Sequence, residues 1–170
     1  MRKLYSALLV VALSVAMVLP VLAAPSPKAD TVAPASAVEV SVADANVKVL
    51  AADVKAEVTN VVTNPTHLTN LGVSTSAKLV SSFDLKYDGE IPAGGVQIPV
   101  KVSNAKVGDY AYILHRSSVD GHWECVGQGY LGADLTVTGT FTSFSPVAVL
   151  VVDAANVAAA GVKAPKTGEF

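Results

Sequence analysis

The stretch that decides the fold is VQIPVKV, residues 96–102, in which apolar and polar side chains alternate. Successive side chains of an extended strand point to opposite faces of a sheet, so the apolar ones are predicted to point inward: Val96, Ile98, Val100 and Val102. Pro99 cannot donate a hydrogen bond to a neighbouring strand. We therefore expect this strand at a sheet edge, or with a bulge at Pro99.

Strand patterns also occur on both sides of this stretch. In residues 79–87 the larger apolar side chains are expected on one face, namely Leu79, Phe83, Leu85 and Tyr87. Residues 147–152, VAVLVV, are apolar on both faces and predict a central strand. Asp120-Gly121 predicts a hairpin turn. About seven short strands separated by Gly, Asp and Asn turns predict a mainly β domain, an antiparallel β-sandwich of the Ig-like type.

Residues 50–62, LAADVKAEVTNVV, have a different period. Their apolar side chains recur at helical spacing and share one face: Leu50, Val54, Val58 and Val61. This pattern predicts one short amphipathic helix on the N-terminal side of the strands. Asn64-Pro65 is expected to end it, because a residue before proline avoids the helical conformation.

The N-terminus has the pattern of a secretory signal peptide. Arg2 and Lys3 precede an uncharged apolar run at residues 4–22, and cleavage is expected after Ala23, which gives a signal peptide of residues 1–23. An uncleaved membrane anchor is the alternative, because the run approaches the length that spans a bilayer. After cleavage no stable membrane span is expected.

Composition divides the remaining chain into three parts. These are a flexible Pro/Ala leader at 24–37, the folded domain at 38–153 and an Ala-rich linker at 154–170. The formal net charge is −2 and there is no long basic run, so nucleic acid is not an expected partner. Cys125 is the single cysteine, so no intramolecular disulfide can form. An exported protein that folds without disulfides fits a Gram-positive bacterial surface better than a eukaryotic secretory route.

Two groups of residues suggest chemistry. Asp120, His122 and Glu124 are close in sequence and suggest a metal site, whereas polar residues at a hairpin tip are more often simply solvated. Cys125 with His115 suggests a cysteine nucleophile, but Cys125 shares a strand face with Trp123 and fits a small core residue better. Because zinc, nucleotide and serine-hydrolase signatures are missing from the sequence, we expect no enzyme activity, cofactor or metal.

The aromatic residues offer a different kind of site. Tyr110, Tyr112 and Trp123 form a candidate ligand face, since such side chains stack on sugars. The alternative is that Trp123, the only tryptophan, fills the centre of the core. The sequence favours core packing.

Two long segments carry a resemblance to a known module. GDYAYILHRSSVDGHWECV (residues 108–126) and LTVTGTFTSFSPVAVLVVD (residues 135–153) resemble a C-terminal β-sandwich module of secreted surface proteins of clostridia and related Firmicutes. The recurring parts are a Leu-His strand, an Asp-Gly-x-Trp hairpin and a final Thr-Ser-x-Ser-Pro-Val-Ala strand. The resemblance covers about residues 79–153. It implies a sandwich architecture and no catalytic residues.

The C-terminal residues resemble a sortase sorting signal, Leu-Pro-x-Thr-Gly, which is cut between Thr and Gly. The motif comprises Ala164, Pro165, Lys166, Thr167 and Gly168. Alanine stands where leucine is usual, and the apolar span and basic tail that normally follow are not in the sequence. The sequence therefore leaves open a chain truncated just past the motif, or a released protein.

Taken together, these patterns predict a non-catalytic, secreted or cell-surface module of a Gram-positive bacterium, with a structural or adhesin-like role. Sortase and peptidoglycan are its expected partners, along with an extracellular glycan or protein ligand. The first alternative is a carbohydrate-binding module. The second is a hydrolase that uses Cys125 or a histidine metal site.

Overall fold

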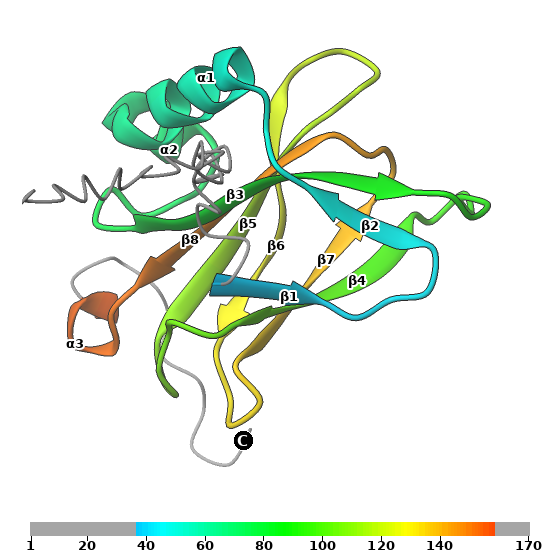
Figure 1. The fold of residues 1–170 in the computed structure, drawn as a ribbon. Helices are drawn as coiled ribbons and strands as arrows, with labels where there is room; N and C mark the ends of the chain where they lie inside the picture. Colours follow the sequence, from blue (N-terminus) through cyan, green and yellow to red (C-terminus); the bar gives the residue numbers. More distant parts are fainter. Residues whose placement is uncertain (1–36, 159–170) are drawn as a thin grey trace, which may run out of the picture. The chain divides into compact units, whose positions relative to one another are not determined.

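A computed structural model describes residues 37–158 of the chain. The predicted signal peptide, residues 24–36 of the predicted leader and the predicted sorting motif lie outside the described residues. The described part forms eight strands and three helices (Figure 1), in the order β1 (Val38–Val40), β2 (Ala45–Lys48), α1 (Ala52–Thr63), α2 (Pro65–Asn70), β3 (Lys78–Tyr87), β4 (Val96–Val102), β5 (Tyr110–Arg116), β6 (Trp123–Tyr130), β7 (Thr136–Phe141), β8 (Pro146–Val152) and α3 (Ala154–Val157).

The strands form two antiparallel sheets. One sheet has three strands in the order β1-β4-β7, and the other has five in the order β2-β3-β8-β5-β6. The prediction of a mainly β fold with antiparallel strands is confirmed. The central strand predicted at residues 147–152 is also confirmed, because β8 lies in the middle of the larger sheet and is buried along almost its whole length.

An apolar core joins the two sheets. The inward side chains of β4 and β7 meet those of β3, β5 and β8 in one cluster, whose largest members are Phe83, Leu85, Ile98, Ile113 and Phe141. Ile98, Val100 and Val102 are fully buried, as the alternation in residues 96–102 predicts. Burial of this apolar surface is the main term that holds the two sheets together.

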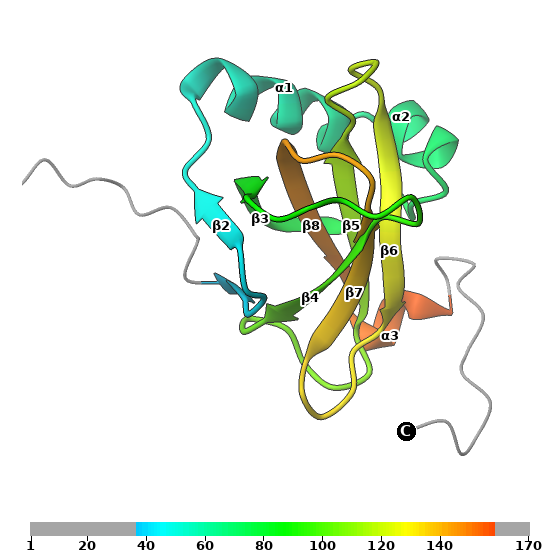
Figure 2. The same ribbon diagram turned by 90° about the vertical axis from the view of Figure 1, so that its right-hand side faces the viewer.

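A second apolar cluster lies on the other face of the five-stranded sheet. Val58, Val62 and Leu68 of α1 and α2 pack there on Tyr112, Leu114 and other side chains of β5 and β8. Figure 1 shows α1 and α2 on the opposite side of β3 and β8 from β1 and β4. In Figure 2, α1 crosses one end of these strands and α3 lies at the other. The five-stranded sheet is therefore covered on both faces.

The position of Pro99 differs from the prediction of an edge strand. β4 is the middle strand of its sheet, and Pro99 pairs with Thr138 of β7. β1, however, pairs with β4 only from Val38↔Val102 to Val40↔Val100. Because backbone groups alternate between the two neighbours of an antiparallel strand, the nitrogen of Pro99 faces the side that β1 has already left. The proline thus removes an N–H group that would have no strand partner.

Leu79 is also placed differently from the prediction. A bulge between Leu79 and Ser81 inserts one extra residue opposite β8, which reverses the alternation at that point. Ser81, Phe83 and Leu85 are buried, whereas Leu79 is exposed. The single face predicted for residues 79–87 is therefore wrong at its first residue.

The helical part is larger than the one helix predicted. α1 ends before Asn64-Pro65 as expected, but Pro65 then opens α2. The Asn64 side chain accepts hydrogen bonds from the backbone N–H groups of Thr66 and His67, which makes it an N-cap with proline in the first turn.

The C-terminal boundary of the folded part lies beyond Asp153. α3 forms one helical turn at the start of the predicted linker, and its Val157 is buried. The buried carboxylate of Asp109 accepts hydrogen bonds from the backbone N–H groups of Lys106 and Ala154, each at 2.8 Å. This side chain ties the start of α3 to the loop between β4 and β5.

Candidate functional site

The β5–β6 hairpin carries most of the residues that the sequence suggests for a site. Its connection is the predicted Asp120-Gly121 turn, in which Gly121 has a φ of 75° that favours glycine. The Gly121 N–H donates to the Ser117 carbonyl, and the Ser117 N–H donates to the His122 carbonyl. The turn therefore sets the register that places Trp123 opposite Arg116 and Glu124 opposite His115.

Three aromatic side chains lie half-buried on the helix-facing side of this hairpin: Tyr110, Trp123 and Tyr130, hereafter the aromatic strip. The Tyr110 and Tyr130 rings meet edge to face, with centroids 4.9 Å apart. Burial raises the pKa of the Tyr110 hydroxyl above its usual value, so this hydroxyl stays neutral under ordinary conditions. Tyr112, which the sequence places on the same ligand face, is only 2% exposed and packs under the helices instead.

A carboxylate from α1 holds one end of the strip. The Trp123 Nε1–H donates to Glu57 Oε1 at 3.1 Å, and the same oxygen lies 3.2 Å from Arg116 Nε. We call these three residues the Glu57 clamp. Trp123 is thus neither the centre of the core nor a free surface ring, because it joins the hairpin to α1 with one edge of its indole.

A second polar group lies on the opposite face of the hairpin, inside the core. The His115 ring is completely buried and packs edge to face on Phe141, with centroids 5.5 Å apart. Its Nδ1 lies 3.1 Å from Glu124 Oε1, and its Nε2 lies 3.4 Å from Ser145 Oγ. The Ser145 hydroxyl also donates to the backbone carbonyl of Arg116. We call His115, Glu124 and Ser145 the histidine network.

The connectivity of this network is that of a serine–histidine–carboxylate triad, but its exposure is not. A general base in such a triad must reach the leaving group of the substrate. The His115 side chain is fully buried, and the Ser145 hydroxyl hydrogen is directed at a carbonyl. The network therefore contains a buried titratable group, His115, which a substrate could not reach as a general base.

Cys125 and His115 do not come together. Cys125 pairs with Leu114 and packs on the helix-facing side, whereas His115 points into the inter-sheet core. The thiol donates to the Gly127 carbonyl, and burial raises its pKa. Burial therefore keeps the sulfur protonated, which disfavours a nucleophilic role.

Asp120, His122 and Glu124 do not converge either. Asp120 and His122 form an exposed pair at the tip of the hairpin, with His122 Nδ1 3.5 Å from Asp120 Oδ2, while Glu124 turns toward His115. Among residues 37–158, no three side chains of the His, Cys, Asp or Glu type form a group that could hold a metal ion.

Sequence reasoning missed Glu57, Ser145 and the role of Glu124. Glu57 and Trp123 are 66 positions apart, and Ser145 is 30 positions from His115. The only local signal was that His115 and Glu124 lie in the two strands joined by the Asp120-Gly121 turn, nine positions apart. Residues of the two strands of a hairpin can be cross-strand neighbours, but the turn alone did not specify this pair.

These observations define a class of protein: a mainly β protein with two antiparallel sheets, in which helices cover the outer face of the larger sheet. Comparison with known proteins adds no family, because no protein-family model, curated protein or solved structure matches the chain. None of the helices in the described part of the chain has the length and apolar character needed to cross a membrane.

Proposed function

We propose that this chain is a non-catalytic, adhesin-like module of a Gram-positive cell surface, and that it binds a glycan through the aromatic strip. The observation that carries the proposal is the strip itself, three half-buried aromatic rings on one face of one hairpin. The two facing sheets would then be an Ig-like sandwich that serves as a scaffold. Their shared core supports this description.

The strip has the properties of a saccharide platform. Aromatic faces bind the apolar faces of sugar rings, and the polar edges of Tyr and Trp reach hydroxyl groups. Trp123 and Tyr130 mark the two ends of β6, so the strip extends over roughly 20 Å, from about 3.3 Å per residue. The exposed Gln128 shares this face and supplies both a donor and an acceptor. An extended glycan chain fits such a surface better than a small compact ligand.

A binding test separates the strip from the rest of the surface. Titration of the protein with soluble bacterial cell-wall polysaccharide and with chitin oligomers, followed by calorimetry, is expected to show binding to at least one of them. Tyr130→Ala should weaken that binding about tenfold or more, as is usual for an aromatic anchor. Tyr87→Ala is the matched control, because Tyr87 is a half-buried tyrosine that stacks on Phe144, away from the strip.

Either of two results would contradict the glycan assignment. One is the absence of heat with every polysaccharide tested, at protein concentrations that detect millimolar affinity. The other is equal loss of binding in Tyr87→Ala and Tyr130→Ala at matched stability, which would point to a fold defect.

Export and wall attachment are the second half of the proposal. They are supported by the Arg2-Lys3 start, the apolar run and the match of Pro165, Thr167 and Gly168 to a sorting signal. Expressed from its own gene in a Gram-positive host, the protein should begin at Ala24 and appear in the wall fraction. Thr167→Ala should move it to the medium, because the bond that sortase cuts follows that residue. An equal wall fraction for both proteins would contradict sortase attachment.

A further inference from the structure

The histidine network contains more hydrogen-bond contacts than a neutral histidine can fill. A carboxylate only accepts, so the contact between Glu124 and His115 requires a hydrogen on Nδ1. The neutral ring then presents a bare lone pair at Nε2. Ser145 has one hydroxyl hydrogen, yet both His115 Nε2 and the Arg116 carbonyl lie beside its oxygen as acceptors. One added proton, on Nε2, would satisfy all three contacts at once.

Burial opposes that added proton. The His115 ring is 0% exposed, and removal from water lowers its pKa below the ordinary 6.5, although the hydrogen bond and the charge of Glu124 act in the opposite direction. The proton thus completes the hydrogen bonds but places a cation inside the core. A local opening is enough to hydrate the charged ring. β6 is an edge strand and Glu124 is about half-exposed, so separating this end of β6 from β5 lets water reach His115.

The end of β6 that would separate is the end held by the Glu57 clamp. Trp123 precedes Glu124, and Arg116 follows His115 directly in β5. Ser145 binds the backbone of Arg116, whose side chain lies against Glu57 together with Trp123. The histidine network and the Glu57 clamp therefore share the same two strand ends, on opposite faces of the sheet.

We propose that protonation of His115 opens this end of the β5–β6 hairpin and releases Trp123 from Glu57, so that pH controls the shape of the aromatic strip. The charged groups around the ring are Glu124 on β6 and, on the other face of the sheet, Arg116 with Glu57 of α1. Asp84 of β3 pairs with Pro146 and lies one row away, on the helix-facing side. The consequence for ligand binding rests on the proposed function, whereas the opening itself does not.

The single tryptophan makes the opening measurable without any ligand. As the pH falls from 7.5 to 4.5, Trp123 emission is expected to shift to longer wavelength and acrylamide quenching to increase, in a transition centred below pH 6.5. The sign follows from linkage: an open form whose histidine has the ordinary pKa binds a proton that the closed form does not, so acid favours the open form. The far-ultraviolet circular dichroism should stay unchanged through the transition, because the opening is local.

Variants assign the transition to His115. Glu124→Gln removes the charge that stabilises the imidazolium in the closed form, so it should favour opening and move the midpoint to higher pH. His115→Gln should abolish the transition, whereas His122→Gln, four-fifths exposed at the hairpin tip, should leave it in place. Emission that stays flat in the wild type, or a transition that survives in His115→Gln, overturns the proposal. If His115→Gln does not fold, an unmoved midpoint in Glu124→Gln overturns it equally. A normal fluorescence transition without glycan binding would refute the proposed function alone.

Discussion

Phe141→Ala is expected to lower the free energy of unfolding by about 3–5 kcal/mol, the usual loss when a fully buried phenylalanine is truncated. The Phe141 ring has no exposed surface and lies between His115 and Phe144, with centroid distances of 5.5 and 5.9 Å. It also covers Gly139, where an added Cβ would meet its Cε2 at 2.7 Å. Because the structure around a truncated core residue relaxes only partially, a cavity should remain.

Urea unfolding followed by circular dichroism measures this loss. Since domains are stable by only about 5–15 kcal/mol, the variant is expected to unfold at much lower urea or to be partly unfolded without it. Phe144→Ala is the control, because Phe144 stacks on both Phe141 and Tyr87 but is only half-buried. It should lose clearly less stability. Equal losses would show that the edge of this aromatic stack matters as much as its buried ring.

Strands with an unbroken alternation were predictable from the sequence, and strands with a bulge were not. In β4 every side chain follows the period of two, and its buried and exposed residues are those predicted. In β3 the apolar face was broken only by Ser81, and the bulge before Ser81 turned Leu79 outward. A bulge depends on the partner strand, here β8, and so leaves little trace in the sequence of the bulged strand itself.

The second helix shows how one local signal can have two meanings. Asn64-Pro65 was read as the end of a helix, which it is. The same two residues are also a favourable start, since asparagine caps the free N–H groups and proline suits the first turn. Leu68, buried against the sheet, is the residue that makes α2 part of the fold. Its place in the second cluster follows from tertiary packing, which the local pattern does not report.

The sequence predicted only the part of the candidate site that lies within the β5–β6 hairpin. Turn geometry placed Tyr110, Tyr112 and Trp123 on one face, and the structure keeps them there. Which of the three is open to a ligand depends on α1, α2 and the loop after them, and these cover Tyr112. The Glu57 clamp and the Ser145 contact join segments far apart in the chain. No pattern within either segment predicts which distant residue will meet it.

At Gly127 the two sheets approach each other closely. This glycine faces the core from β6, opposite Ile113, and an added Cβ would lie 2.4 Å from the carbonyl oxygen of Thr138 and 2.8 Å from the Cα of Gly139. Both contacts are with the backbone of β7, a strand of the other sheet. Glycine at this position therefore lets two backbones from different sheets pack directly on each other and closes one side of the core (Figure 2).

Gly127→Ala should accordingly cost about 3 kcal/mol of stability, toward the upper end for overpacking, because backbone atoms cannot turn aside as a flexible side chain can. Gly129, two residues further along β6, is the matched control, since its added Cβ would meet nothing within 4 Å. Gly129→Ala should be neutral or slightly stabilising, because alanine restricts the unfolded chain more than glycine does. The two positions lie on the same face of β6, so the variants differ only in whether the added methyl group meets the backbone of β7 or open space. Urea unfolding of both therefore isolates the contact between β6 and β7, and equal stabilities would refute the close approach of the two sheets there.

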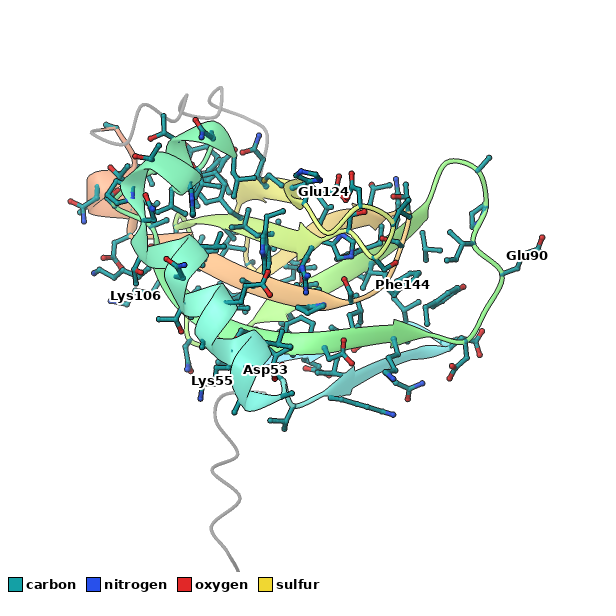
Figure 3. All side chains as sticks on the ribbon, turned by 90° about the horizontal axis from the view of Figure 1, so that it is seen from above. Asp53, Lys55, Glu90, Lys106, Glu124 and Phe144 are labelled. Carbon is teal, nitrogen blue, oxygen red and sulfur yellow. The ribbon has the colours of Figure 1, made fainter. Side chains whose placement is uncertain are left out.

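Glu90 and Glu124 have different surroundings relative to the contact between β6 and β7 at Gly127. Figure 3 shows Glu90 at the outer bend of the β3–β4 loop, pointing away from the sheets, whereas Glu124 and Phe144 lie near the strands. Glu90 is exposed, whereas Glu124 is hydrogen-bonded to His115. Removing the charge of each residue should therefore affect the stability loss of Gly127→Ala differently. Glu90→Gln added to Gly127→Ala should leave its loss of stability unchanged. Glu124→Gln, on the same strand as Gly127, should combine with it non-additively, because both alter how β6 is held against its neighbours.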